Sequence, residues 1–483
     1  MFSFTICLLT LIVGYFTYGK FIEKIFGPDP NIVTPAITQQ DGVDFTPLPS
    51  WKIFFIQFLN IAGLGPIFGA IMGAKFGSAS FLWIVIGSIF AGATHDYLAG
   101  MLSLRNNGAS LTELIGKYLG KTTKKVMVVF TIVLMVLVGV VFVSGPAALL
   151  AKLTPDSLDM LFWIIVIFAY YMLATMLPID KIIGKIYPIF AFALIFMAVG
   201  ILVMLFVHHP DIPELTDGLA NTHPNAEHLP IFPIMFVSIA CGAISGFHAT
   251  QSPLMARCMK NEKHGRPIFY GAMITEGIVA LIWAAAATYF YGENGMEEGN
   301  ASVIVNSITG EWLGAFGGLL AVLGVIFAPI TSGDTALRSA RLIVADALNI
   351  EQKSISKRLL VSLPIFVCTF GILTYSMKDQ SGFDMIWRYF AWCNQALSVF
   401  TLWALTVYLY KQQKMYWVTL VPAIFMTVVC ATYLLVAPEC FGSVMVKIQN
   451  HFEMGNGLSY SIGGTAGLLS IVLFGIWARK NRI

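Results

Sequence analysis

Runs of about 20 consecutive apolar residues recur along the chain, and each is long enough to cross a bilayer as a helix. Hydrophobic residues make up 57% and charged residues only 11% of the 483 residues. A soluble domain carries roughly 25% charged residues. These properties predict an all-α polytopic membrane protein. The net charge of +3 is too small to indicate nucleic-acid binding, and no basic cluster is interleaved with aromatic residues.

Hydropathy predicts about 13 membrane-spanning helices. Their expected positions are 2–20, 51–73, 79–103, 124–151, 158–178, 186–207, 230–252, 267–292, 313–332, 356–375, 385–411, 414–436 and 459–478. The distribution of positive charge tests this count, because Lys and Arg are retained in the cytoplasm during insertion. With the N-terminus outside and the C-terminus in the cytoplasm, the cytoplasmic segments hold 24 of the 29 basic residues.

Two of the predicted spans are interrupted by glycine, at 60–69 and at 239–252. Interrupting a helix in lipid is unfavourable unless the freed backbone groups face protein, water or ligand. Glycine also allows close packing of membrane helices, which is the simpler explanation for a single interruption. A pair of interruptions at matching places in two halves of a chain favours the binding site of a transporter.

Each interrupted span leads a block of five predicted helices. The first block covers 51–207 and the second covers 230–411. Because five is an odd number, the second block enters the membrane inverted relative to the first. This arrangement predicts a LeuT-like 5+5 inverted repeat. An additional N-terminal helix (1–24) precedes the repeats and two C-terminal helices (414–483) follow them, in what is effectively one membrane domain.

Eight short sequence blocks follow one another in a specific order. They are 65–69 (GPIFG), 92–96 (GATHD), 103–110 (SLRNNGAS), 241–248 (CGAISGFH), Glu262, 271–276 (GAMITE), 327–338 (FAPITSGDTALR) and the pair Asn394 and Gln395. Through these blocks, nearly the whole chain resembles the carbon starvation protein A (CstA) family. The resemblance implies an inner-membrane permease linked to carbon starvation, described as a peptide transporter and, for some members, as a pyruvate–cation symporter.

Polar residues inside apolar spans are the candidates for function, because a charged side chain at bilayer depth is unfavourable. His95, Asp96 and Glu276 are candidates for ion coupling or a proton relay, and interhelical hydrogen bonding is the alternative. The candidate substrate-binding residues flank the two interruptions or lie on the last helix of the second block. They are Gly63, Gly65, Ser245, His248, Gln251, Asn394 and Gln395. The two amides also suit hydrogen bonds between helices.

A cation site is expected where hydroxyl groups meet the first interruption. Hard cations take several oxygen ligands, which hydroxyls and backbone carbonyls supply. The candidate ligands are Ile61, Ala62, Thr331, Ser332 and Thr335. The alternative is that the span at 313–332 closes in a polar helix end, with Asp334 paired to Arg338 one turn on. We expect Na⁺ or H⁺ as the coupling ion and no other cofactor.

The function expected from these features is secondary active transport of small carboxylate-bearing nutrients by cation-coupled alternating access. Peptides are the first substrate class, and pyruvate–proton or pyruvate–cation symport is the alternative. A membrane nutrient sensor that does not transport and a channel are further alternatives, although no repeated filter residues indicate a channel. No motif of a metalloprotease or serine hydrolase indicates an enzyme. The expected partners are a small-molecule substrate and membrane lipid, with the oligomeric state left open.

Overall fold

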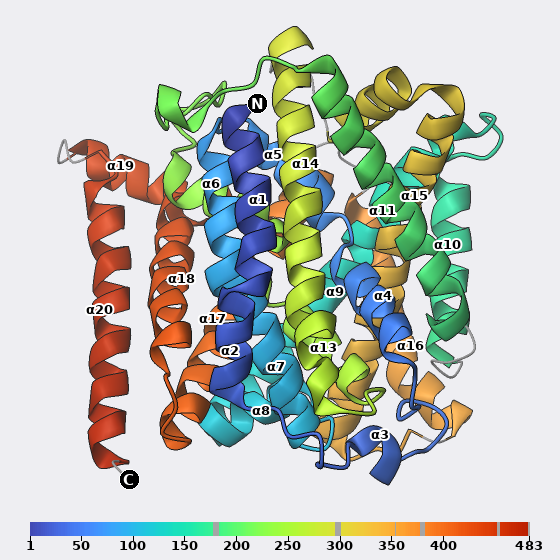
Figure 1. Ribbon diagram of the computed structural model, residues 1–483, viewed down its shortest axis with the longest axis vertical. Helices are drawn as coiled ribbons and strands as arrows, with labels where there is room; N and C mark the ends of the chain where they lie inside the picture. The colour runs from blue at the N-terminus through green and yellow to red at the C-terminus, as the bar shows by residue number, and fades with distance from the viewer. Residues whose placement is uncertain (177–182, 295–300, 353, 377–381, 452–454, 482–483) are drawn as a thin grey trace.

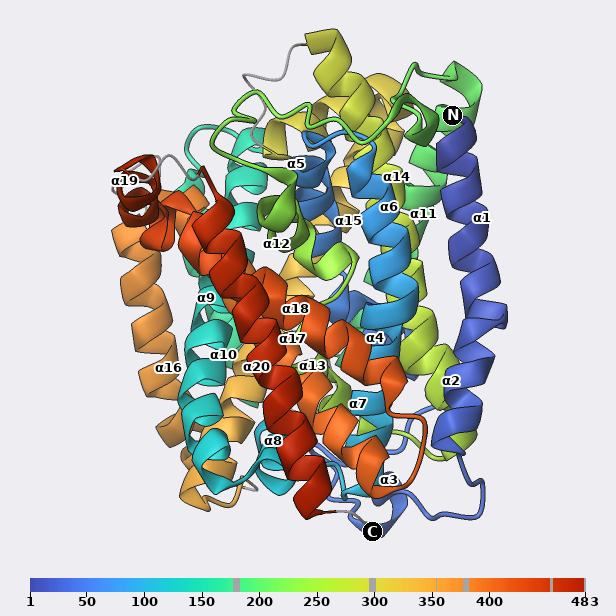
Figure 2. The same cartoon turned by 90° about the vertical axis from the view of Figure 1, so that its left-hand side faces the viewer.

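The computed structural model describes residues 1–176, 183–294, 301–352, 354–376, 382–451 and 455–481. Within these residues the secondary structure is helical, and most helices run up and down a single bundle (Figure 1). Nine of the described helices are long and apolar enough to cross a membrane, or ten if one bent pair counts as a single span. The two ends of the chain lie at opposite ends of the bundle (Figure 2). The all-α membrane fold is therefore as the hydropathy predicts.

The first half of the chain supplies the additional N-terminal span and the first block. A helix pair, α1 (Phe2–Phe16) and α2 (Tyr18–Phe26), forms the first span, and α3 (Pro35–Thr38) lies in the loop that follows. The first block comprises α4 (Ser50–Ile61), η1 (Gly65–Gly69), α5 (Ala70–Ala74), α6 (Ala79–Ile86), η2 (Gly87–Gly92), α7 (Ala93–Arg105), α8 (Leu111–Leu119), α9 (Lys121–Leu153), α10 (Met160–Met176) and α11 (Ile183–His208).

The second half of the chain supplies the segment predicted as the second block and the C-terminal helices. Its elements are η4 (Ile231–Met235), α12 (Phe236–Ile239), η5 (Ala240–Gly242), α13 (His248–Ala256), η7 (Arg266–Tyr270), α14 (Gly271–Asn294), α15 (Ala301–Leu348), α16 (Ile355–Ser376), α17 (Gly382–Lys411), α18 (Trp417–Val436), α19 (Ser443–His451) and α20 (Gly457–Lys480). Short helical turns also occur at η3 (Leu215–Asp217), η6 (Glu262–His264) and η8 (Pro438–Gly442). Helical segments thus occupy the positions expected from hydropathy.

One predicted boundary is wrong. The span at 313–332 was expected to end beside the polar residues Thr331 to Thr335, whereas α15 continues to Leu348 and bends at Gly314, whose φ is 65°. Hydropathy detects the apolar stretch, but the helix extends beyond it because its polar continuation lies inside protein. Arg338 and Arg341 are 1% and 0% exposed.

Burial separates the centre of the bundle from its lipid-facing rim. The most apolar part of the segment containing α14 is 89% buried, whereas that of α20 is 11% buried. Figure 2 shows α20 crossing the outer side of α18. The exposed leucine, isoleucine and valine side chains along α20 suit a surface that contacts lipid chains, because apolar groups on such a surface do not contact water. A polar site is therefore expected within the bundle and away from its lipid-facing rim.

Both predicted interruptions are present, and they face each other. In the first, α4 ends at Ile61 and the chain resumes helical structure at Gly65, with the two parts bent by 53°. In the second, the backbone is non-helical between Gly242 and His248. A Cβ atom on Gly65 would overlap the side chain of Cys241, so the two interruptions are in direct contact. The shared position of two unwound segments defines the centre of the candidate site.

Candidate substrate and ion-coupling site

Four ionisable side chains form a continuous buried chain beside the second interruption. His95 Nδ1 lies 2.7 Å from one oxygen of Asp96, and His248 Nδ1 lies 2.8 Å from the other. The opposite ring nitrogen of His248, Nε2, lies 3.4 Å from Glu276 Oε2. All four side chains have zero solvent exposure. The expected relay residues His95, Asp96 and Glu276 are therefore linked through His248, which the sequence placed with the substrate-binding residues.

Glycines on the first block bring these groups together. The π-helical turn η2 leads directly into α7, which carries His95 and Asp96. A Cβ atom on Gly92 would overlap the carbonyl of Ala243, so this turn packs directly on the second interruption. Ser88 Oγ also donates a hydrogen bond to the Gly242 carbonyl at 3.0 Å. The close approach places Asp96 beside the first residue of α13.

The donor and acceptor pattern of the chain suits proton exchange. An ionised aspartate only accepts hydrogen bonds, so Asp96 receives Nδ1–H from both imidazoles. His95 Nε2 and both oxygens of Glu276 have no hydrogen-bond partner among the described residues. The 3.4 Å gap between His248 and Glu276 is short enough for an ion pair and longer than a normal hydrogen bond. An imidazole with a proton on each ring nitrogen can donate to a carboxylate on either side.

Side chains of α17 hold the second interruption in its unwound conformation. Asn394 Oδ1 accepts hydrogen bonds from Ser245 Oγ at 3.0 Å and from the Phe247 amide at 2.7 Å. Gln395 Nε2 donates to the Ile244 carbonyl at 2.8 Å. These bonds satisfy backbone groups that a continuous helix would have paired. Asn394, Gln395 and Ser245 thus lie at the interruption as predicted, with their hydrogen bonds directed at the protein; their role toward a substrate stays a prediction.

The first interruption has a simpler environment. Ser332 Oγ lies 2.9 Å from the Leu59 carbonyl, two residues before the expected partner Ile61, and 3.0 Å from the Ala328 carbonyl of its own helix. Gly63 packs against the ring of Phe142 and the hydroxyl of Ser332. Thr331 and Thr335 instead return their hydroxyls to carbonyls of their own helix. Ser332 thus reaches the first broken helix, and the expected cation site stays a prediction.

One buried acid near this site was missed by the sequence reasoning. The Tyr187 hydroxyl donates to Asp334 Oδ2 at 2.7 Å and lies 3.2 Å from the Thr331 carbonyl. Asp334 is fully buried, and its other oxygen has no hydrogen-bond partner in the described structure. The sequence considered it only in the alternative in which it pairs with Arg338. The available signal was an acid that directly follows an apolar run and precedes a buried arginine by one turn.

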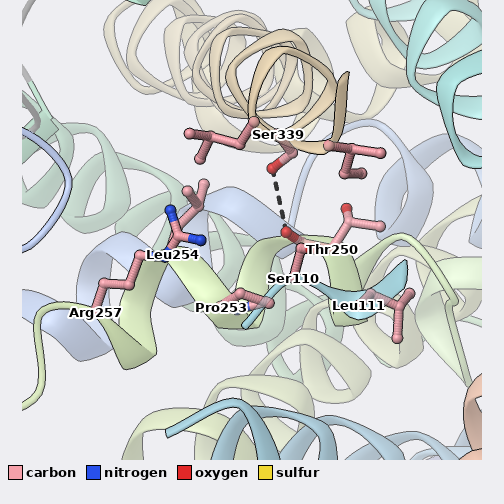
Figure 3. Close-up of a pocket in the computed structure, with 9 residues that line it drawn as sticks. Ser110, Leu111, Thr250, Pro253, Leu254, Arg257 and Ser339 are labelled. Atoms are coloured by element: carbon pink, nitrogen blue, oxygen red, sulfur yellow. Dashed lines mark hydrogen bonds between the residues drawn. The ribbon is translucent and has the colours of Figure 1, made fainter. Parts of the chain in front are cut away.

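Gln251 points away from the two interruptions. Its amide nitrogen lies 2.8 Å from Thr250 Oγ1 and 3.5 Å from Ser339 Oγ on α15. Thr250 and Ser339 line a narrow cavity between α13 and α15, into which Arg257 also points (Figure 3). The expected substrate-binding residues therefore divide into a group at the interruptions and one residue, Gln251, that lies near Ser339 on α15.

Two facing broken helices within one bundle define a class of membrane transporter, the LeuT fold. The structure of MhsT in complex with L-phenylalanine matches with a TM-score of 0.55 at 13% identity, covering 87% of this chain and 97% of that chain. A mutant of the Eremococcus coleocola manganese transporter matches with a TM-score of 0.53 at 13% identity, covering 90% and 99%. At this identity the likeness concerns the fold alone.

The family model described as "Carbon starvation protein CstA" matches residues 1–162, 145–296 and 291–433. The chain belongs to the CstA family, which confirms the resemblance carried by the eight sequence blocks. It is 27% identical to the "Peptide transporter CstA" of Campylobacter jejuni over 86% of this chain and 77% of that protein. It is 28% identical to the "Pyruvate/proton symporter BtsT" of Escherichia coli over 57% of this chain and 47% of that protein. The protein is a membrane transporter.

Proposed function

We propose that the chain carries small carboxylate-bearing nutrients, peptides first, across the cell inner membrane in symport with protons. The observation that carries the proposal is the buried chain His95–Asp96–His248–Glu276 beside the second interruption. A relative matched over 86% of this chain is named a peptide transporter, which favours peptides. A relative named a pyruvate/proton symporter makes pyruvate the second substrate candidate.

A proton on His248 has a direct mechanical consequence. The imidazolium then lies between two carboxylates and ties α13 to α7 through Asp96 and to α14 through Glu276. Loss of the proton leaves two buried carboxylates with no cation between them, which weakens both ties. Because α13 is half of a broken helix, it is free to tilt when these ties loosen. Proton binding and release are thereby coupled to opening of alternate sides of the site.

The second interruption also offers a position at which a substrate carboxylate can bind. The N-terminus of α13 begins at His248, and helix N-termini favour negative charge. A substrate carboxylate is therefore stabilised there by the same field that stabilises Asp96 and Glu276. The excess of basic residues in the segments assigned to the cytoplasm supports an N-terminus outside and a C-terminus inside.

The decisive measurement is uptake of a labelled dipeptide or pyruvate into proteoliposomes with an imposed proton or sodium gradient. We expect a proton gradient alone to drive accumulation. The Glu276→Gln variant, which cannot ionise at this position, should lose accumulation and retain exchange of substrate between the two sides. Glu311→Gln, an exposed acid on α15, is the matched control and should behave as the wild type.

Two outcomes would redirect the proposal. Wild-type accumulation in Glu276→Gln would place proton coupling elsewhere in the molecule. Accumulation driven by sodium alone would favour a second candidate, sodium symport, which the contact between Ser332 and the first broken helix supports. The Ser332→Ala variant would then lose sodium-driven uptake.

A further inference from the structure

A carboxylate of the loop between α3 and α4 lies within a group of arginines, and Figure 1 shows this loop toward the lower end of the bundle. Asp44 belongs to the loop between α3 and α4, and its side chain is 6% exposed. One of its oxygens, Oδ1, lies 3.6 Å from Arg338 Nη1 and 3.6 Å from Arg341 Nη2, both on α15. Burial by itself raises the pKa of the Asp44 carboxyl, but Arg341, Arg338, Arg257 and Arg358 outweigh it, and the pKa lies below its usual value.

The ion pairs of Asp44 are loose. Charge-assisted hydrogen bonds between arginine and carboxylate are about 2.7 to 2.9 Å long. Asp44 Oδ1 has no hydrogen-bond partner, and neither do Nε and Nη2 of Arg341, within the residues that the structure describes. Nε and one Nη of an arginine form the fork that binds a carboxylate through two parallel bonds. The fork of Arg341 is fully buried, faces a carboxylate and makes no hydrogen bond with it.

Asp44 is carried by a strap, which we define as residues 39–49. The strap is non-helical, and Asp41 Oδ1 stabilises its turn by accepting the amides of Val43, Asp44 and Phe45. Few bonds fix the strap to the bundle: the Leu48 amide donates to the Cys258 carbonyl at 3.1 Å, and the Phe45 ring lies 5.0 Å from the Arg257 guanidinium. A segment held in this way can separate from the helices without unfolding any of them.

The strap lies at the end of α13 that is distant from the second interruption, where it contacts Arg257 and Cys258. The small cavity between α13 and α15, bordered by Thr250, Ser339 and Arg257, has an apolar surface (Figure 3). Its volume of about 10 Å³ accommodates no more than about one water molecule. Arg338 and Arg341, which contact Asp44, are neighbours of Ser339 in the sequence of α15. The space along α13 toward this end of the molecule is therefore narrow, and the strap covers its end.

We propose that Arg257, Arg338 and Arg341 form an exit site for the carboxylate of the substrate, and that Asp44 is a tethered occupant displaced when the substrate passes. The identification of the ligand as a transported substrate rests on the proposed function. The site itself requires only a small carboxylate. While the strap is in place, the Asp44 carboxylate compensates the charges of the arginines. When the strap has moved away, the carboxylate of the passing substrate compensates them.

The first experiment is chemical rescue of Asp44→Ala, purified in detergent without any gradient. Removing the side chain leaves space for acetate beside Arg341, whose Nε and Nη2 make no hydrogen bond in the described structure, so we expect a lower unfolding temperature that acetate restores and acetamide does not. Asp44→Ala combined with Arg341→Gln should lose the response to acetate. Glu113→Gln, a carboxylate on α8 that is 41% exposed, is the matched control and should resemble the wild type. Absence of rescue in Asp44→Ala, or rescue that persists in the double variant, would overturn the exit site.

A second experiment uses the wild-type protein and remains informative if Asp44→Ala does not fold. Cys258 is fully buried and its carbonyl is bound by the strap, so maleimide modification of Cys258, quantified by mass spectrometry, reports strap release. We expect a saturating transported carboxylate to raise the modification rate by about tenfold, since it replaces a buried ion pair. Buried Cys430 on α18 is the internal control. An unchanged rate at Cys258 would show that the strap does not move.

The failure of each proposal can be distinguished. Rescue of Asp44→Ala by acetate together with no gradient-driven uptake would retain the anion site and reject the proposed transport function. Uptake in liposomes without acetate rescue would retain the transporter and reject the exit site.

Discussion

The first broken helix receives few side-chain hydrogen bonds where it unwinds, whereas the second is held by polar side chains from another helix. Residues 62–64 of the first pack against Phe142 and receive one hydroxyl contact, from Ser332 to the preceding Leu59 carbonyl. Residues 243–247 of the second are bound by Asn394 and Gln395 of α17 and lead into the buried charges around His248. The same device, a helix opened at glycine, is thus stabilised in two physically different ways.

This difference suggests a division of labour between the two segments. A segment with many specific hydrogen bonds has one preferred conformation, which suits precise placement of a proton-binding group. A segment with few such bonds changes conformation at less cost, which suits a moving part or a weakly held ion. Substitutions at the second interruption should therefore have larger effects than substitutions at the first, and four variants test this order.

Asp96→Ala should have the largest effect. It removes the acceptor shared by His95 and His248 and leaves both imidazoles buried without their charged partner. Breaking a buried charged network in this way costs about 4 kcal/mol, and transport should be lost with it. Thermal unfolding and proteoliposome uptake measure the two effects. The exposed Asp156→Ala serves as the control, and equal stability of the two variants would show that the buried chain is not a structural tie.

Asn394→Ala should follow. Two donors at the second interruption lose their acceptor, and the Cys241 thiol loses the amide group 3.3 Å away. We expect a loss of about 3 kcal/mol, because buried donors left without partners carry their full desolvation penalty. Thr401→Ala on the same helix removes a hydroxyl bonded within α17 and should cost about 1 kcal/mol. Similar unfolding temperatures for the two variants would contradict the bracing role of Asn394.

Gly65→Ala tests the contact between the two interruptions. The added methyl group would overlap Cys241, and overpacking of this kind costs about 2 kcal/mol. Combining it with Cys241→Gly should restore much of the loss by making room. Gly464→Ala on α20, where the new methyl group meets nothing within 4 Å, is the control. A destabilisation that the second substitution leaves unchanged would mean that the two segments do not press on each other.

Ser332→Ala should have the smallest effect. It removes one hydrogen bond to the Leu59 carbonyl, for a loss of about 1 kcal/mol. Thr335→Ala, whose hydroxyl bonds only within α15 in the described structure, provides the comparison. Unfolding measured with and without NaCl extends the test: stabilisation by sodium in the wild type that disappears in Ser332→Ala would establish the predicted cation site at the first interruption.

The sequence carried much of this fold because the bilayer imposes simple rules. Apolar runs located the helices, and glycines within them located both interruptions. The same rules do not state which helices are neighbours. The sequence therefore placed His248 with the substrate residues, whereas its two ring nitrogens face Asp96 and Glu276 from two other helices. Adjacent residues of a helix point about 100° apart, yet His95 and Asp96 hydrogen-bond to each other.

Two other features were hidden for related reasons. Asp44 lies in a loop rich in proline and polar residues, which reads as irregular, and its arginine partners on α15 are about 300 residues away. Nothing in a local pattern connects them. The polar half of α15 falls below any hydropathy threshold, although protein rather than water surrounds it. Pairs of charges that are distant in the sequence can be identified only in the structure, whereas the hydropathy of each segment indicates whether it contacts lipid.

The π-helical turn at Gly87–Gly92 has a consequence for how this protein can tolerate change. Such a turn holds one residue more than a regular helical turn, and each residue advances a helix by about 100°. Everything after it, including His95 and Asp96, is rotated by that angle relative to α6. Deleting a single residue between 87 and 92 would restore a regular helix and swing both side chains toward a different neighbour. The number of residues in this turn, more than their identity, therefore sets the direction in which the Asp96 side chain faces.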